Sequence, residues 1–271
     1  MPLSAGASLR LALPKGRMQD AVVRLLADAG IDLRSGARGY RPTLSLPGFE
    51  TKVLKPQNIV EMLHLGSRDV GFAGADWVAE LDADLVELLD TGLDPVRIVA
   101  AAPTTLLVGG RLPSDRPVVV ASEYERLTRA WIGRAGLNAT VVRSFGATLE
   151  ANGLAIIDEL MRSSTRLYAH PRSLDDPARR AALDSLVLLL RSVLEARTRV
   201  MLEVNVARAQ LEALVAILPC MREPTIAPLH GDIGFAVKAA VPRRELPVLI
   251  PRIKAVGGTD IVVSALSQLV P

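Results

Sequence analysis

Residues 52–80 read KVLKPQNIVEMLHLGSRDVGFAGADWVAE, and this stretch decides the fold class of the chain. Its pattern predicts a strand, a turn, a helix, a second strand, a tight loop and a second helix. Pro56 breaks the first strand, Asn58 is suited to cap the helix that follows, and Gly66 suits the left-handed residue that ends it. Three apolar residues at helical spacing form the buried face of that helix: Ile59, Met62 and Leu63.

The same stretch contains a turn that is placed to face a ligand. A strand over 70–73 is followed by Gly74-Ala75-Asp76, which leads directly into the next helix. A glycine at such a turn lets free backbone N–H groups approach a ligand without a side chain between them. The alternative is an ordinary strand-to-helix turn capped by Asp76. The spacing leaves both interpretations open.

Composition indicates a folded protein with room for two or three domains, because 49% of its 271 residues are hydrophobic and 23% are charged. No apolar run is long enough to span a bilayer, and the N-terminus lacks the pattern of a secretory signal. A single cysteine, Cys220, excludes an internal disulfide and fits a reducing compartment. We therefore expect a cytoplasmic protein with no membrane partner.

The net charge of +3 is mild, and acidic residues interleave with the arginines between Arg162 and Arg199. This pattern is typical of a solvated helical face, so we expect no nucleic-acid partner. A small anionic ligand accounts for the basic balance. The three histidines, His64, His170 and His230, lack metal-ligand spacing, so no metal ligand is predicted among them.

A second candidate binding turn lies near the N-terminus. Residues 9–14 form a predicted strand, Lys15-Gly16-Arg17 follows at its carboxyl end, and a helix closed by Gly30 comes next. Ligands of open α/β sheets bind beyond the carboxyl ends of strands, and Lys and Arg suit phosphate. The alternative is plain surface charge at a helix start, although the helix dipole disfavours cations there.

The middle of the chain continues the alternation of strands and helices, which indicates a largely parallel α/β sheet. We expect a hairpin over 43–54 around Pro47-Gly48, helix or loop over 81–90, and strands over 96–102 and 106–108 that cross into a second lobe. A strand over 118–121 precedes a capping-box pattern, Ser122 to Glu125, that starts a helix ending at Gly136. A further strand is predicted over 139–142.

From Arg199 onward the order changes to βαββαβ, a split βαβ sandwich of the size of a small regulatory module. The predicted elements are a strand over 200–206, a helix over 209–218, strands over 224–229 and 233–241, a helix over 244–256 and a strand over 260–266.

Five segments, in the correct order over most of the chain, resemble the long form of the ATP phosphoribosyltransferase family, the first enzyme of histidine biosynthesis. They are LRLALPKGR (9–17), LKPQNIVEMLHLGSRDVGFAGADWVAE (54–80), ASEYERLTRAWIGRAG (121–136), LEANGLAIIDEL (149–160) and MLEVNVARAQLEALVAILPCMREPTIAPLHGDIGFAV (201–237).

The resemblance implies two lobes similar to periplasmic binding proteins, with the active site in their cleft, and a C-terminal ferredoxin-like (ACT-like) regulatory domain. The implied division places lobe I at 1–95 with 164–198, lobe II at 96–163 and the regulatory domain at 199–271. The resemblance also implies a homohexamer.

The implied reaction transfers a phosphoribosyl group from phosphoribosyl pyrophosphate to N1 of ATP and releases pyrophosphate, with Mg²⁺ present. Both substrates are polyanions and the ribosyl carbon becomes cation-like, so the protein must mainly neutralise charge and position the reactants. The implied substrate-binding residues are Lys15, Gly16, Arg17, Lys55, Gly74 and Asp76. No catalytic residue and no metal ligand is assigned.

The chain departs from the family pattern after the strand over 139–142. The family has a glutamate there, then a further strand, then a Thr-Gly-x-Thr-Leu loop that cradles the 5′-phosphate. Here NATVVRSFGAT leads straight into LEANGL. Gly146, Thr148 and Leu149 can match the end of that loop, which adds Gly146 and Thr148 to the implied substrate-binding residues. Alternatively, Gly146 is the glycine before the missing strand, and in both cases one strand and most of the phosphate loop are absent from the sequence. We therefore expect lobe II to lack a core strand. The alternative function is a non-catalytic ligand-binding protein that keeps the fold.

The resemblance further implies feedback by histidine, bound near Asn205, Met221, Thr225 and Asp260. Asn205 and Asp260 can accept the ammonium or imidazole N–H groups, the Thr225 hydroxyl can meet the carboxylate, and Met221 gives an apolar wall. The alternative is that these are ordinary edge residues of the sandwich.

Overall fold

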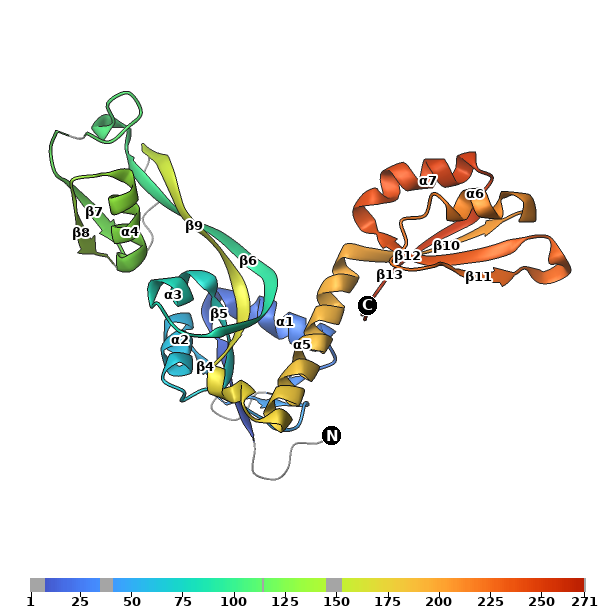
Figure 1. Ribbon diagram of the computed structural model, residues 1–271, viewed down its shortest axis with the longest axis horizontal. Coiled ribbons are helices and arrows are strands. Elements are labelled where there is room, and N and C mark those ends of the chain that lie inside the picture. Colours follow the sequence, from blue (N-terminus) through green and yellow to red (C-terminus); the bar gives the residue numbers. More distant parts are fainter. Residues whose placement is uncertain (1–7, 35–40, 114, 145–152, 271) are drawn as a thin grey trace. The chain divides into compact units, whose positions relative to one another are not determined.

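The computed structural model describes residues 8–34, 41–113, 115–144 and 153–270 (Figure 1). The chain forms two compact units: unit 1 comprises Met1–Arg24 and Ile31–Asp184, and unit 2 comprises Leu25–Gly30 and Ser185–Pro271. Within the described ranges, no helix combines the length and the apolar character needed to cross a membrane.

Unit 1 is built on a five-stranded sheet with the strand order β4-β1-β5-β9-β6. The strands are β1 (Leu9–Pro14), β4 (Phe49–Leu54), β5 (Val70–Gly74), β6 (Val86–Pro103) and β9 (Leu154–Ala169). β1 is parallel to β4 and β5, whereas β9 is antiparallel to both β5 and β6. All five residues of β5 are buried, as expected of a central strand covered on both faces.

The helices of unit 1 follow the strand ends. Three lie wholly within it: α2 (Pro56–His64), α3 (Ala75–Glu80) and α4 (Glu125–Ala135). The boundary between the units falls inside two further helices, α1 (Gln19–Asp28) and α5 (Pro177–Thr198), so unit 1 holds only their first turns. The prediction of Asn58 as the cap of α2 is wrong. The helix begins at Pro56 with Lys55 as its cap, because a proline at the first helical position is already set to helical φ.

The buried face of α2 consists of Ile59, Val60 and Leu63, so the prediction is confirmed for two residues, while Met62 is half-buried. The predicted left-handed Gly66 is confirmed with φ +67°.

At the end of this sheet where β1 and β5 begin, Asp69 is buried and accepts hydrogen bonds from Arg10 N (2.7 Å) and Arg10 Nε (2.9 Å). Burial by itself raises the pKa of Asp69, but the hydrogen bonds and the charge of Arg10 outweigh it. The pKa of this carboxyl therefore lies below its ordinary value.

Two predictions for residues 43–90 are wrong. β3 (Thr43–Leu44) pairs with β2 (Leu33–Arg34) and not with β4, because β4 forms a parallel ladder of six residue pairs with β1. The part of 81–90 that was expected to be helix or loop contains the first five residues of β6.

β6 and β9 form a long antiparallel ribbon that leads from the first sheet to a second lobe (Figure 1). That lobe contains β7 (Val118–Ser122), α4 and β8 (Ala139–Arg143), and β7 and β8 pair in parallel as a separate two-stranded sheet. The predicted strand over 106–108 is wrong, since a 3₁₀ turn occupies Thr104–Leu106 and Val108 makes only an isolated bridge with Arg111.

The N-terminus of α4, in the second lobe, is capped by a side chain from the first lobe. Ser122 Oγ accepts from Tyr124 N at 3.0 Å, so the predicted capping box does not form. Instead, the Glu80 carboxylate, at the end of α3, accepts from Arg126 N (2.9 Å) and Leu127 N (3.0 Å). The helix ends at left-handed Gly136 (φ +62°), as predicted.

Unit 2 has the predicted βαββαβ order. Its elements are β10 (Arg199–Val206), α6 (Leu211–Val215), β11 (Thr225–Pro228), β12 (Phe235–Pro242), α7 (Leu246–Ala255) and β13 (Thr259–Ala265). The strands form an antiparallel sheet in the order β11-β12-β10-β13, and Figure 1 shows α6 and α7 on one of its faces. Alternate residues of β10 pack with Leu214, Leu249 and Ile253 of these helices, so the fold class predicted for this module is confirmed.

Candidate active site

A cavity of about 770 Å³ lies in unit 1, at the carboxyl ends of β1 and β5 and along the outer parts of β6 and β7. This volume falls in the range of small-molecule sites, roughly 300–1,000 Å³. Four of the eight predicted substrate-binding residues line it: Lys15, Arg17, Gly74 and Asp76. The structure thus brings together two turns that are about 60 residues apart in the sequence. They meet because each follows the carboxyl end of one of two adjacent parallel strands, β1 and β5.

Lys15 and Arg17 are the cations of this cavity from the first turn. β1 ends at Pro14, and Lys15 N donates to Leu54 O (2.9 Å), which fixes the backbone as it leaves the sheet. Gly16 adopts φ +80°, a left-handed conformation that disfavours other residues, and it begins the 3₁₀ turn Gly16–Met18 that contains Arg17. Both side chains are exposed, so they can meet an anionic ligand without the cost of burying an unpaired charge.

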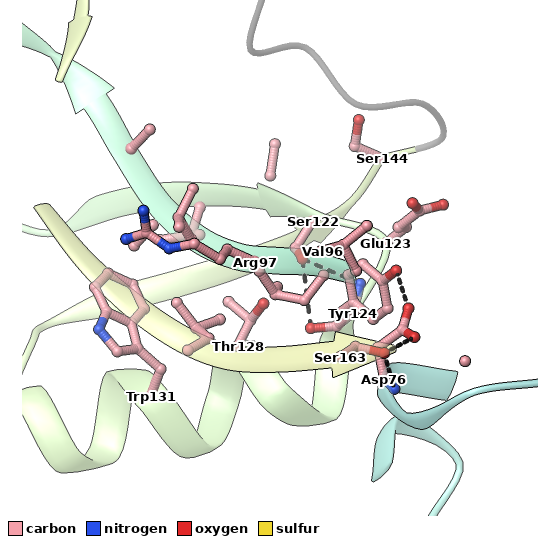
Figure 2. Close-up of a pocket in the computed structure, with 18 of the residues that line it drawn as sticks. Asp76, Val96, Arg97, Ser122, Glu123, Tyr124, Thr128, Trp131, Ser144 and Ser163 are labelled. Atoms are coloured by element: carbon pink, nitrogen blue, oxygen red, sulfur yellow. Dashed lines mark hydrogen bonds between the residues drawn. The ribbon is translucent and has the colours of Figure 1, made fainter. Parts of the chain in front are cut away.

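The carboxylate of Asp76 is the buried polar centre of the cavity. Asp76 is 6% exposed, its Oδ1 accepts from Ser163 Oγ (2.6 Å) and its Oδ2 accepts from the Tyr124 hydroxyl (2.6 Å) (Figure 2). The same Ser163 oxygen accepts from Asp76 N at 3.0 Å. Charge-assisted bonds of this length are among the stronger hydrogen bonds in proteins.

Gly74 is required by this network. It is the cap residue of α3, and a Cβ added there would collide with the Asp76 carboxylate. The Asp76 side chain does not cap its own helix, so the interpretation of this turn as a helix start capped by Asp76 is wrong. A side chain between β5 and α3 is excluded because the carboxylate occupies that space.

Burial and the Asp76 carboxylate together keep the Tyr124 hydroxyl protonated. Burial raises the pKa of its hydroxyl most, and the hydrogen bond to Asp76 and the negative charge of Asp76 raise it further, well above the ordinary value. The Tyr124 ring also lies 5.0 Å from the Trp77 ring, centroid to centroid, in a tilted arrangement. Tyr124 is therefore a hydrogen-bond donor and a ring surface at neutral pH, and not a base.

Sequence reasoning missed Tyr124 and Ser163. The sequence pattern places Tyr124 only within a capping box, and its position two residues after the end of β7 is the signal that could have found it. Ser163 lies within the polar run Arg162–Ser164 of β9, 87 residues from Asp76, and no local pattern pairs the two.

The remaining predicted residues lie elsewhere. Gly16 and Lys55 are exposed and adjoin residues that line the cavity, but do not line it themselves. Gly146 and Thr148 lie outside the described residues. Across the described ranges, no group of three or more His, Cys, Asp or Glu side chains is arranged to hold a metal ion.

In unit 2, Asn205 Nδ2 donates to Asp260 Oδ2 (3.1 Å), so two of the four predicted effector residues meet on adjacent strands. Thr225 is exposed on β11, with β12 between it and β10, which places its backbone roughly 10 Å from β10 at ordinary strand spacing. Met221 is half-buried in the segment before β11.

Comparison with known proteins identifies the family of both parts of the chain. A family model described as ATP phosphoribosyltransferase matches residues 55–192, and one described as the HisG C-terminal domain matches residues 196–268. Among solved structures, a chain of the ATP phosphoribosyl transferase (HisG:HisZ) complex from Thermotoga maritima has a TM-score of 0.59 at 22% identity. That match covers 69% of this chain and 98% of that one, and shows the fold alone.

Curated relatives span nearly the whole chain. The ATP phosphoribosyltransferase of Pelotomaculum thermopropionicum is 34% identical over 290 aligned positions, which cover 97% of this chain and 99% of that protein. That of Chlorobium chlorochromatii is 31% identical, covering 97% of each. An alignment of 290 positions exceeds the 271 residues of this chain by 19, so the Pelotomaculum protein has residues without a counterpart here. The chain is a member of the ATP phosphoribosyltransferase family.

Proposed function

We propose that this chain transfers the phosphoribosyl group of phosphoribosyl pyrophosphate to N1 of ATP, as an early step of histidine biosynthesis. The observation that carries the proposal is the cavity that Lys15, Arg17 and the buried Asp76 line together. Family membership across 97% of the chain supports it. No observation favours the non-catalytic ligand-binding alternative over a transferase.

In this reaction a bond forms between N1 of ATP and C1′ of the ribosyl group, and the bond from C1′ to the pyrophosphate oxygen breaks. The electron pair of that bond leaves with pyrophosphate. Lys15 and Arg17 supply the positive charge that neutralises phosphate oxygens, and Arg17 can do so through two parallel hydrogen bonds. Because both substrates are polyanions, this neutralisation also lowers the cost of bringing them together.

Asp76 and Tyr124 take a positioning role in the proposal. With both its oxygens already accepting hydroxyl hydrogens, the Asp76 carboxylate is a fixed acceptor for ribose hydroxyl or base N–H groups. The neighbouring rings of Trp77 and Tyr124 present flat apolar surface on which an adenine can stack. Gly74 leaves free the space that this carboxylate occupies.

Mg²⁺ enters the proposal with the substrate. This ion usually keeps several waters and binds through one or two carboxylates together with substrate phosphates, and not in an all-protein cage. Among the described residues, no group of three or more His, Cys, Asp or Glu side chains is arranged to hold a metal ion, so the cavity does not provide such a cage. The proposal therefore places the ion on the pyrophosphate group of the substrate.

We also propose the domain division 1–95 with 164–198, 96–163 and 199–271, with histidine as an effector bound by the third domain. The family-model match to 196–268 and the separate sheet of unit 2 support the last boundary. The Asn205–Asp260 pair supports the effector site, because it gathers acceptors at the ends of two adjacent strands. A cytoplasmic location and a homohexamer complete the proposal.

The test is a coupled assay of pyrophosphate release at high enzyme concentration, with ATP and phosphoribosyl pyrophosphate both present. Release that requires both substrates and is lost in Asp76→Ala supports the proposal, with single-substrate reactions as controls. If calorimetry detects ATP binding but no pyrophosphate is released at any enzyme concentration, the transferase proposal fails and the ligand-binding alternative stands.

A further inference from the structure

A second cavity of unit 1 lies at the end of the five-stranded sheet that is remote from the substrate cavity. It has a volume of about 350 Å³ and lies where β1 and β5 begin and where β9 passes into the turn before α5 (Figure 1). Arg10 of β1 lines it, whereas Lys15, just after the end of β1, lines the substrate cavity. Five residues of extended strand span roughly 16 Å, so the two cavities are separate.

The described lining of this cavity, which we call the Arg172 cavity, is rich in cations. Its charged and titratable members are three arginines, two histidines and one acidic residue: Arg10, Arg172, Arg179, His64, His170 and Asp69. One carboxylate against three guanidinium groups leaves an excess of two positive charges. None of these residues lines the substrate cavity.

The acidic residue of the Arg172 cavity, Asp69, is already occupied by donors of the chain. Asp69 is 3% exposed, and Arg10 N and Nε donate to its Oδ2 while Arg10 Nη2 donates to its Oδ1 at 2.9 Å. Ser173 Oγ and Arg179 Nη1 lie 3.5 Å and 3.4 Å from the same Oδ1. The carboxylate therefore holds the arginines in place, and the cavity presents N–H donors and positive charge to a ligand.

Arg172 and His170 supply donors that the chain does not use. Within the described ranges, the exposed Arg172 side chain makes no hydrogen bond or ion pair. The backbone N–H of Arg172 donates to His170 Nδ1 at 3.2 Å. A neutral imidazole whose Nδ1 accepts a hydrogen bond carries its own hydrogen on Nε2, so His170 offers an N–H donor from that nitrogen.

Arg179 is the third partly free donor. Its side chain makes one bond within the described part of the chain, to Asp69 at 3.4 Å, and this is longer than the 2.7–2.9 Å of a typical charge-assisted pair. The acidic residue nearest to it in the sequence, Asp176, does not line the cavity. Asp176 Oδ1 instead accepts from Ala178 N (2.8 Å) and Arg179 N (3.0 Å) at the start of α5.

Arg68, the residue before Asp69, also responds to the positive charge at this end of the sheet. Burial lowers the pKa of its guanidinium most, and the charges of Arg10 and Arg41 lower it further. Glu50 and Asp69 act in the opposite direction and do not compensate. Two neighbouring cations thus act on Arg68 in the direction expected of a region of positive potential, which an anion would relieve.

We propose that the Arg172 cavity binds the phosphate group of a small anion, either inorganic phosphate or a small phosphate ester. A phosphate dianion matches the excess of two positive charges, and a guanidinium group can donate in parallel to two phosphate oxygens. Arg172, Arg179 and His170 Nε2 are the donors. The volume lies near the lower end of small-molecule sites, roughly 300–1,000 Å³, which suits a compact anion. The proposal rests on the fold and is independent of the reaction.

The test follows individual arginines, because phosphate can also bind at Arg17 in the substrate cavity. The full chain is treated with phenylglyoxal, which modifies guanidinium groups, and peptide mass spectrometry gives the rate at each arginine. Saturating inorganic phosphate should slow the modification of Arg172 and Arg179 by about ten-fold or more, because a guanidinium paired with phosphate is not free to react. The rate at Arg180, which is exposed and outside the cavity, should not change. Sodium chloride at equal ionic strength controls for screening.

Two alanine variants test the donors. In Arg172→Ala, the phosphate concentration that half-protects Arg179 should rise by about ten-fold or more, as expected for the loss of a charge-assisted contact. The matched control is Arg180→Ala, which removes the same charge from a neighbouring exposed position and should leave that concentration unchanged. Because the Arg172 side chain has no partner among the described residues, Arg172→Ala should fold normally, and circular dichroism verifies this.

Two other anions identify the ligand chemistry. Glycerol 3-phosphate tests a phosphate ester: protection at a lower concentration than inorganic phosphate identifies an ester as the ligand, and at a higher concentration the free ion. Acetate carries one negative charge and should not protect Arg172 at the concentrations at which phosphate does.

Four outcomes overturn the proposal. One is a rate at Arg172 that phosphate does not change. Another is equal protection of Arg172 and Arg180, which would show screening alone. The third is protection by acetate as strong as that by phosphate, which would make this a carboxylate site. The last is unchanged protection of Arg179 in folded Arg172→Ala.

Discussion

Ser163→Ala is the sharpest single perturbation of the cavity, because one hydroxyl makes two buried hydrogen bonds. Ser163 is 5% exposed, donates to Asp76 Oδ1 at 2.6 Å and accepts from Asp76 N at 3.0 Å. A hydrogen bond to a charged group contributes about 1.5–3 kcal/mol, and a buried N–H left without a partner costs about 1–3 kcal/mol. Since the Tyr124 hydroxyl continues to bind the carboxylate, we expect the free energy of unfolding to fall by about 2–4 kcal/mol.

The neighbouring residue provides a matched control. Ser164 Oγ donates to Asp90 Oδ1 at 2.7 Å, but this bond is exposed, so Ser164→Ala should change the free energy of unfolding by less than about 1 kcal/mol. Both substitutions remove one hydroxyl from adjacent positions of the same strand. The difference between them therefore reports burial of the Asp76 network and not the loss of a serine from β9.

Urea unfolding followed by tryptophan fluorescence is the appropriate assay. Both tryptophans of the chain, Trp77 and Trp131, lie in unit 1, so the signal follows the unit that contains the network. The measurement is made at pH 7 for the parent chain and both variants. Equal midpoints for Ser163→Ala and Ser164→Ala, with equal slopes, would refute the argument, because they would mean that Asp76 does not depend on Ser163.

Four further predictions follow from the same contacts. Arg17→Ala should weaken ATP binding about ten-fold or more, as the loss of a charge-assisted contact predicts, while exposed Arg24→Ala on α1 should not, and calorimetry on both decides. Pyrophosphate release by this chain should be far slower than by the Pelotomaculum relative assayed alongside, since the sequence lacks most of the phosphate loop that the family resemblance implies; an equal rate would contradict this. L-histidine should raise the melting temperature and Thr225→Ala should reduce that rise, so a flat titration curve would exclude the effector site. Asp69 has a lowered pKa in the folded state, so its contribution to the free energy of unfolding is complete above its ordinary pKa of 3.8 and is lost as the pH falls through the folded-state pKa. Asp69→Asn should therefore be less stable than the parent chain at pH 7 and should lack this part of the acid dependence. Urea unfolding at several pH values measures both effects.

Most elements of the fold could be predicted from local pattern. The strand–turn–helix order of residues 52–80, the βαββαβ order after Arg199 and the left-handed glycines Gly66 and Gly136 all depend on neighbours within a few residues. The failures are pairings. β4 alternates like half of a hairpin but joins β1 in a parallel ladder, because the choice of partner depends on strands far along the chain.

The candidate site divides in the same way. The sequence by itself determined which turns carry Lys15, Arg17, Gly74 and Asp76, because cations and glycines at strand ends are local signals. Only the tertiary structure decided what Asp76 does. Its partners come from β9 and from the residue before α4, 87 and 48 positions away, and the long β6–β9 ribbon brings them to it. A buried carboxylate must find hydrogen-bond donors wherever packing places them, and local sequence does not encode that distance.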